Sequence, residues 1–174
     1  MTPGGAMPRT YHLRRSQRVS SPLEEVYAYF SDAENLDALT PPFLRFRILT
    51  PHPVHMRVGT RIEYALALFG VPLRWRTHIT VWEPGRRFVD EQASGPYASW
   101  VHTHTFEGVG GGTVIHDHVA YALPLGLLGA VAHTLFVRAT LRRIFDFRHA
   151  ATARAFAGDV ASSEYVPRPA DARS

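Results

Sequence analysis

The strongest constraint on the fold is an alternation of apolar and polar residues with a period of two, which runs from Leu44 to Tyr121. A strand places successive side chains on opposite faces of a sheet, so this pattern predicts half-buried antiparallel strands. Short segments rich in Gly and Pro separate the strands and predict tight turns, for example at residues 83–86, 94–97 and 108–112. We therefore expect an antiparallel meander in this region.

Two short helices are predicted between a first strand and this meander. Tyr11–Val19 alternates as a strand, and the spacing of Ser21 and Glu24 after it is typical of a capping box at a helix start. Ser31 and Glu34 repeat that spacing for a second helix. The chain then breaks at a pair of prolines before the meander begins.

A long amphipathic helix is predicted from about Gly129 to Ala157 at the end of the chain. Such a helix must bury its apolar side, and the meander offers one apolar sheet face. The predicted fold class is therefore α+β, with a curved antiparallel sheet of about seven strands wrapped around the C-terminal helix. Residues 10–158 would form this domain, between flexible tails at residues 1–9 and 159–174 that lack periodicity.

The composition excludes several kinds of chemistry. The 174 residues fall within the range of one domain, and they include no Cys and no Lys. A lysine Schiff base, a thiolate nucleophile and a Cys-ligated metal centre are therefore excluded. All 19 basic residues are Arg and are dispersed along the chain, so the net charge of +4 predicts a solvated basic surface and no nucleic-acid partner.

The N-terminal segment contains no apolar stretch of signal-peptide length, so we expect a cytoplasmic protein. The most apolar segment, residues 119–137, is close to the length that spans a bilayer. It is interrupted by Pro124, Gly126, Gly129 and His133, which indicates the end of a strand, an apolar loop and a helix start. We expect at most a transient membrane contact through this loop.

The parity of the late strands decides where their polar residues point. Trp100, His102, His104 and Phe106 share one face of their strand, and the bulky aromatic members belong on the covered side. In the next strand we place the set with the larger apolar residues inward, which includes Asp117 and Tyr121. By the same reasoning Asp90 and Gln92 follow an inward Phe88, so we expect a polar cluster of Asp90, Gln92, His102, His104 and Asp117.

The element order, together with the segments NLDALTPPFLRFRIL (35–49), FVDEQASGPYASWVHTHTF (88–106) and TVIHDHVAYALPLG (113–126), resembles the SRPBCC or START-like helix-grip superfamily. It is most similar to bacterial members described as polyketide cyclase/dehydrase-like or coenzyme-Q-binding-like. The similarity covers Tyr11 to Ala157. It implies a deep apolar cavity between the sheet and the C-terminal helix, but it does not name a ligand, because the superfamily includes carriers, receptors and enzymes.

We therefore expect the cavity to bind a small hydrophobic or aromatic molecule, such as a lipid, a quinone or a polyketide-like compound. Its apolar wall would comprise Tyr64, Trp75, Trp100, Phe106 and Tyr121. The polar cluster would orient a polar end of the ligand, because buried polar groups require hydrogen-bond partners. The oligomeric state does not follow from the sequence.

Three further interpretations of the polar cluster stay open. A His and an Asp on neighbouring strands often form a satisfied internal network. Alternatively, His102 or His104 could act with Asp117 as an acid–base pair in a cyclase, dehydratase or hydrolase. A metal site could use the two histidines and a carboxylate, but no metal-binding signature supports it, and we expect neither metal nor cofactor.

Overall fold

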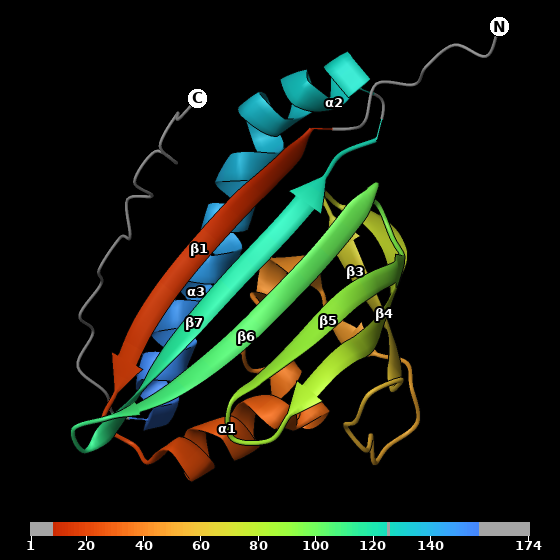
Figure 1. The fold of residues 1–174 in the computed structure, drawn as a ribbon. Helices are drawn as coiled ribbons and strands as arrows, with labels where there is room; N and C mark the ends of the chain where they lie inside the picture. The colour runs from red at the N-terminus through yellow and green to blue at the C-terminus, as the bar shows by residue number, and fades with distance from the viewer. Residues whose placement is uncertain (1–8, 125, 157–174) are drawn as a thin grey trace, which may run out of the picture.

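One antiparallel sheet of seven strands forms the body of the molecule (Figure 1). The computed structural model describes residues 9–124 and 126–156. The strand order is β1-β7-β6-β5-β4-β3-β2, so that consecutive strands from β2 to β7 are neighbours and β1 closes the sheet beside β7. The strands are β1 (Thr10–Val19), β2 (Arg47–Ile48), β3 (Arg61–Leu68), β4 (Val71–Glu83), β5 (Arg87–Ser94), β6 (Ser99–Val109) and β7 (Gly112–Ala122).

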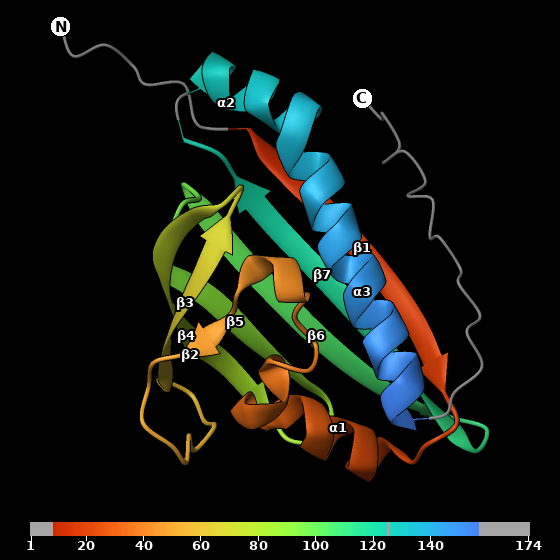
Figure 2. The same ribbon diagram turned by 180° about the vertical axis from the view of Figure 1, so that it is seen from behind.

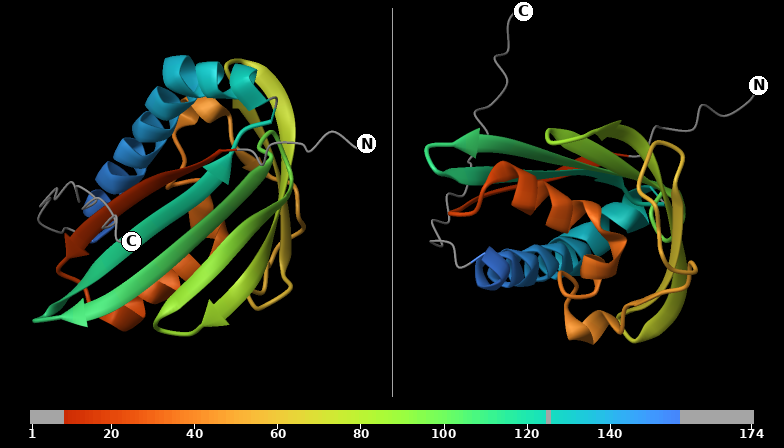
Figure 3. Two further views of the ribbon diagram at one scale, coloured as in Figure 1. Left: turned by 45° about the horizontal axis from the view of Figure 1, so that its top comes forward. Right: turned by 90° about the horizontal axis from the view of Figure 1, so that it is seen from below.

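All helices lie on one side of the sheet. Figure 2 shows α3 crossing the inner face of the sheet, with α1 at the lower end, and Figure 3 shows the sheet curling around them. This arrangement confirms the predicted α+β helix-grip fold. The helices are α1 (Leu23–Ser31), the 3-10 helices η1 (Ala33–Leu36) and η2 (Pro42–Leu44), α2 (Gly126–Ala132), the π-helical segment η3 (His133–Val137) and α3 (Arg138–Phe156).

The helix starts differ from the sequence-based expectation. The N-cap of α1 is Pro22, without a side-chain hydrogen bond, so the predicted capping box of Ser21 and Glu24 is wrong. The second helix is a 3-10 helix capped by Asp32, whose carboxylate accepts a hydrogen bond from the backbone N–H of Glu34. The C-terminal helical segment begins at Gly126, earlier than predicted, and passes through a π-helical turn before α3.

The apolar core is divided into two clusters along β6 and β7. One cluster lies at the α1 end and includes Tyr27, Phe106 and Ile115. The other lies toward α2 and includes Val119 and Tyr121. The inward polar residues of both strands lie between the two clusters in sequence, so the strands position polar groups in the middle of an apolar face.

No helix among the described residues is long and apolar enough to cross a bilayer. Residues 1–8 and 157–174 lie outside the described residues, and the tails predicted at 1–9 and 159–174 fall there apart from Arg9. The domain boundaries therefore stay a prediction.

Candidate functional site

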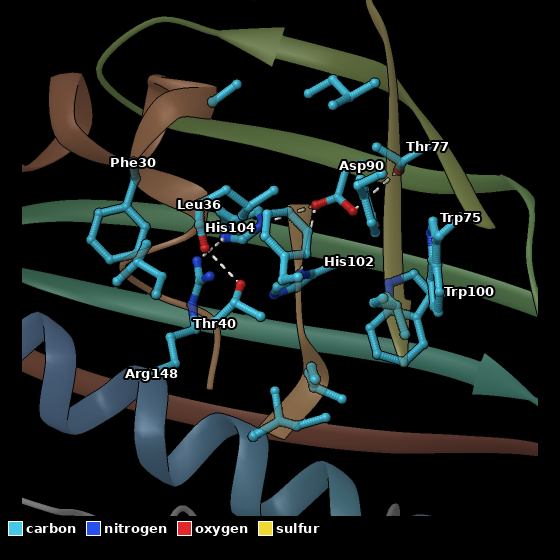
Figure 4. Close-up of a pocket in the computed structure, with 18 of the residues that line it drawn as sticks. Phe30, Leu36, Thr40, Trp75, Thr77, Asp90, Trp100, His102, His104 and Arg148 are labelled. Carbon is cyan, nitrogen blue, oxygen red and sulfur yellow. Dashed lines mark hydrogen bonds and ion pairs between the residues drawn. The ribbon is translucent and has the colours of Figure 1, made fainter. Parts of the chain in front are cut away.

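Both histidines of β6 point into the molecule, as their parity predicts. His102 is 7% exposed and His104 is 4% exposed, and on β7 Asp117 is 9% exposed. The register positions them, because His104 lies opposite Asp117 across β6 and β7. Asp90 lies opposite His102 across β5 and β6. Three neighbouring strands thus bring these four side chains together, and Figure 4 shows three of them, Asp90, His102 and His104.

The four side chains and Arg148 form one continuous network. His104 contacts both acids, with Nε2 3.0 Å from Asp90 Oδ2 and Nδ1 3.0 Å from Asp117 Oδ1. His102 Nε2 lies 3.0 Å from the same Asp117 oxygen, whereas its Nδ1 lies 3.6 Å from Asp90 Oδ2. Arg148 completes the network from α3, with its Nε 3.5 Å from Asp117 Oδ2.

These distances assign the protons. Two of the three 3.0 Å contacts, from His102 Nε2 to Asp117 and from His104 Nε2 to Asp90, are hydrogen bonds and need a proton on each Nε2. The third, from His104 Nδ1 to Asp117, is an ion-pair contact, and the raised pKa of His104 favours a proton on this nitrogen as well. We therefore assign His104 as an imidazolium and His102 as a neutral ring protonated at Nε2. Two cations, His104 and Arg148, then balance two carboxylates, which satisfies the requirement that buried charges are paired. The Nδ1 atom of His102 is left with a free lone pair.

The electrostatic environment supports this assignment. Burial, and next the neighbouring His104, lower the pKa of His102. Burial also opposes the charge on His104, but hydrogen bonds to Asp117 and Asp90 outweigh it and raise the pKa of that ring. Burial alone would raise the pKa of the Asp117 carboxyl, yet Arg148 and the two histidines hold this pKa well below its ordinary value. Burial likewise opposes the charge on Asp90, but the hydrogen bond from His104 and the nearby His102 lower the pKa of this carboxyl.

Arg148 is a member of the site that the sequence-based reasoning missed. Its side chain is buried on the inner side of α3, and its guanidinium also lies 5.1 Å from the centre of the Phe30 ring. Its Nη2 lies 3.4 Å from His104 Nδ1. The sequence did indicate that Arg148 lies on the inner side of the helix. It follows Leu141 by seven residues and Ile144 by four, and it therefore shares their side.

A cavity of about 190 Å³ opens beside the network, between the sheet, α3 and the short helices. His102, His104 and Asp90 form its polar end, and Arg148 also reaches it. The opposite wall is aromatic, with Trp75 and Trp100 in edge-to-face contact at 5.3 Å. Of the predicted ligand-binding residues, six line the cavity: Tyr64, Trp75, Asp90, Trp100, His102 and His104.

Four predicted residues lie elsewhere. The amide of Gln92 bonds to the backbone of Tyr97 at the β5–β6 turn and does not join the polar cluster. Phe106 points inward but packs against α1. Tyr121 packs in the second core cluster, where its hydroxyl contacts His133. Asp117 lies behind the two histidines and contacts the cavity only through them.

The short helices contribute a part of the lining that strand parity could not reveal. Leu36 in η1, Thr40 after it and Leu44 in η2 all line the cavity. These residues lie in irregular segments with no period, so their direction had no signature in the sequence. The chain between β1 and β2 thus forms part of the cavity wall.

A metal would have to use Asp90, His102 and His104, whose candidate ligand atoms lie within 4.8 Å of one another. Among the described residues this is the one such group of three or more. Ligation by His104 Nε2 requires loss of its proton, and a divalent ion would then leave one excess positive charge beside Arg148. Buried uncompensated charge is costly, so the donor set fits a proton network better than a metal.

The family model described as polyketide cyclase / dehydrase and lipid transport matches residues 10–157. The chain belongs to this family. The match confirms the resemblance to SRPBCC proteins noted from the sequence. No curated protein matches the chain in a sequence comparison.

Solved structures share the fold of this family member at low sequence identity. A protein of Thermus thermophilus is 18% identical, with a TM-score of 0.62 over 84% of this chain and 97% of that one. A Thalictrum norcoclaurine synthase bound to a transition-state analogue is 13% identical, with a TM-score of 0.62 over 87% and 99%. A di-domain aromatase/cyclase of the steffimycin biosynthetic pathway is 17% identical, with a TM-score of 0.61 over 85% and 51%.

Proposed function

We propose that residues 10–158 form a domain that binds a small hydrophobic or aromatic molecule, such as a lipid, a quinone or a polyketide-like compound, in the cavity between the sheet and α3. The observation that carries this proposal is a cavity with a mainly apolar and aromatic lining, into which His102, His104, Asp90 and Arg148 bring a group of buried polar side chains. A few convergent polar groups in an apolar pocket are what orients a small ligand.

The size of the cavity limits the part of the ligand that it encloses. An apolar cavity of about 150 Å³ is large enough for benzene. A volume of about 190 Å³ therefore accommodates one aromatic group of slightly larger size. A longer molecule would extend beyond this enclosed volume.

The polar end favours a ligand that donates a hydrogen bond. His102 Nδ1 carries a lone pair, and Asp90 presents carboxylate oxygens, one of them 3.4 Å from the Thr77 hydroxyl. Both groups accept hydrogen bonds. A phenol, an enol or an alcohol fits this end better than a ketone or an ether.

The test is native mass spectrometry of protein purified gently from its own host, followed by extraction and identification of the bound molecule. We expect a small aromatic or apolar compound on the wild type and none on Leu66→Trp, which fills the cavity from β3. Ala65→Trp is the matched control, because its side chain lies on the other face of the same strand. A compound retained equally by Leu66→Trp would contradict the proposed binding site.

A second candidate function is acid–base catalysis in the same cavity, as in a cyclase, dehydratase or hydrolase. The observation that favours it is the free Nδ1 of His102, whose ring is held by Asp117 and whose lowered pKa keeps it neutral and able to accept a proton. The relation to a norcoclaurine synthase and an aromatase/cyclase supports the same class.

Two variants separate binding from catalysis once the ligand is known. His102→Gln removes the free base, and Asp117→Asn weakens the group that orients it. For a binding protein, both variants change the affinity for the extracted compound while the compound stays chemically unchanged. For an enzyme, the wild type converts the compound, and His102→Gln lowers kcat by about 10²-fold or more.

A further inference from the structure

The end of the molecule that carries α2 exposes an unusual amount of apolar surface. Eight large hydrophobic residues are exposed among the described residues, and six of them lie at this end. We call these six residues the apolar tip: Phe69, Val71, Leu128, Val131, Leu135 and Phe136, each between 51% and 71% exposed. Single exposed apolar residues are ordinary, whereas a cluster of this size indicates an interaction surface.

Two separate parts of the chain build the apolar tip. Phe69 and Val71 flank the turn of the β3–β4 hairpin, and Phe69 lies 6.2 Å from Phe136 of η3 in edge-to-face contact. Leu128, Val131 and Leu135 follow one another at intervals of three and four residues, the spacing of one side of a helix. Figure 3 shows the hairpin and α2 together at one end of the molecule.

The surroundings of the apolar tip are basic. The segments 64–82 and 118–145 contain no Asp or Glu. Arg138 and Arg142 are exposed directly after η3 and share a surface hollow with Thr134, Arg143 and Asp146. Asp146 is the first acid after this segment, and it pairs with Arg15. Arg74 and Arg76 add less charge, because both pair with Glu63.

The apolar tip borders the cavity. Leu68 directly precedes Phe69 and lines the cavity, and Leu141 lines it from the first turns of α3. Residues of the tip are therefore close sequence neighbours of residues that line the cavity.

We propose that the apolar tip docks on the surface of an anionic lipid bilayer, with its six apolar side chains in the interfacial region and Arg138 and Arg142 at the headgroups. Apolar side chains rimmed by basic residues are the combination that binds such interfaces. A second copy of the chain fits less well, because a two-fold contact over this patch would bring the same arginines together. This proposal does not depend on the identity of the cavity ligand.

The test is cosedimentation of the full chain with vesicles of phosphatidylcholine alone and with added phosphatidylglycerol. Removal of one Leu or Phe side chain from water strengthens partitioning by roughly tenfold to a hundredfold. We therefore expect Leu135→Asp/Phe136→Asp to lower the vesicle partition coefficient by at least about tenfold. Val58→Asp is the matched control, since Val58 is 60% exposed in the loop before β3, away from the tip. It should bind as the wild type does.

A further variant tests the two arginines beside the apolar tip, Arg138 and Arg142. Arg138→Gln/Arg142→Gln should weaken binding to the anionic vesicles and leave the weaker binding to phosphatidylcholine unchanged. Absence of vesicle binding by the wild type, or equal binding by Leu135→Asp/Phe136→Asp, would overturn the proposal. A third result would also overturn it: light scattering shows that the wild type is a dimer, Leu135→Asp/Phe136→Asp is a monomer, and neither protein binds vesicles. The tip would then be a contact between two copies of the chain. Circular dichroism verifies that each variant is folded.

Discussion

At the scale of single residues, the most consequential feature is a histidine held between two carboxylates. His104 contacts Asp90 and Asp117 at the same distance of 3.0 Å, and its ring stacks on Phe88 at 4.2 Å. His102, the next inward residue of β6, contacts Asp117 through one nitrogen and keeps the other free. The two side chains have the same two carboxylate neighbours, but Asp90 lies 3.0 Å from His104 and 3.6 Å from His102, and the pKa values of the two rings shift in opposite directions.

This difference predicts two separate histidine titrations. His104 should titrate above the ordinary value of 6.5, because Asp117 and Asp90 outweigh its burial, and His102 should titrate below it. The favourable contribution of His104 is complete below the ordinary pKa and is lost as the pH rises through its raised pKa. The buried neutral His102 destabilises the fold as the pH falls below 6.5, since the unfolded chain then takes up the proton.

Nitrogen-15 NMR of the histidine rings measures both values, and His104→Gln identifies the signal that belongs to His104. Together the pair should contribute most to stability near pH 6.5. Coincident titration of both rings at the ordinary value would contradict the assigned proton arrangement.

Arg148 should be one of the residues on which folding depends most. Arg148→Met removes the α3 cation that pairs with Asp117 and leaves that carboxylate buried beside the histidines alone. Loss of one partner of a buried ion pair costs about 3–5 kcal/mol. Urea unfolding should show a loss of this size, and Arg148→Met/Asp117→Asn should recover part of it.

The matched control for this experiment is Arg15→Met, which removes a cation of the exposed pair with Asp146. Exposed pairs contribute about 0–1 kcal/mol, so its unfolding free energy should stay close to that of the wild type. An equal loss of unfolding free energy in Arg148→Met and Arg15→Met would show that the buried pair of Arg148 with Asp117 is not the cause of the loss.

The sequence allowed the inward direction of these residues to be predicted, but not their position along the sheet. Parity placed His102, His104 and Asp117 on the covered face correctly. It placed Gln92 there too, yet the β5–β6 pairing ends at Glu91 and Val101, so Gln92 lies beside the turn and bonds to it. Alternation defines a face of a strand, whereas proximity depends on register, which the alternation does not contain.

At the scale of elements, the tight fit between β1 and β7 fixes the corner where the first helix begins. A methyl group added at Gly112 would collide with the backbone oxygen of Val19, whereas one at Gly108 would meet only the Leu23 side chain, 3.8 Å away. Both glycines belong to the β6–β7 hairpin. The alternating pattern predicted these strands well, because each half-buried strand repeats its signal several times.

Gly112→Ala should therefore lower the unfolding free energy by about 1–3 kcal/mol, the usual cost of forcing extra volume into a packed site. Gly108→Ala should change it much less. Thermal or urea unfolding of the two variants gives this comparison directly. A tolerated Gly112→Ala would show that β1 and β7 can separate at this corner without cost.

The starts of the helices were predicted less well than the strands, and the physical reason differs between helices. The N-cap of α1 is Pro22, so Ser21 lies one residue before the position from which a side chain caps a helix. The segment between α2 and α3 is π-helical, so its turn holds one residue more than an α-helical turn. Its residues are mostly exposed, and the sequence therefore has no apolar pattern that could reveal this additional residue.

At the scale of the whole molecule, the cavity should respond to ligands as a preformed site. Binding to the folded state alone stabilises it by about 2.7 kcal/mol at a ligand concentration of 100 times Kd. With 1-naphthol as the probe, the melting temperature should rise by several degrees in the wild type and in Ala65→Trp. It should not rise in Leu66→Trp, in which the indole occupies the space.

A comparison of the affinities for 1-naphthol and naphthalene measures how much a hydrogen bond to the polar end of the cavity contributes to binding. One additional hydrogen bond contributes about 0.5–1.5 kcal/mol, so the hydroxyl should tighten binding by roughly twofold to tenfold. His102→Ala should remove this preference. Equal affinities of the wild type for the two compounds would place the polar end outside the reach of the ligand.

The first strand forms one edge of the sheet and pairs with the last strand, which has consequences for biogenesis. Thr10 pairs with Ala122 and Val19 with Thr113, so the ladder of β1 joins segments that leave the ribosome far apart in time. Contacts of such long range form slowly. During synthesis the neighbour of β1 is missing until β7 has emerged, and Arg148 emerges later still. The nascent chain must therefore carry an unsatisfied edge for most of translation, and the charged network can assemble only after nearly the whole domain has been made.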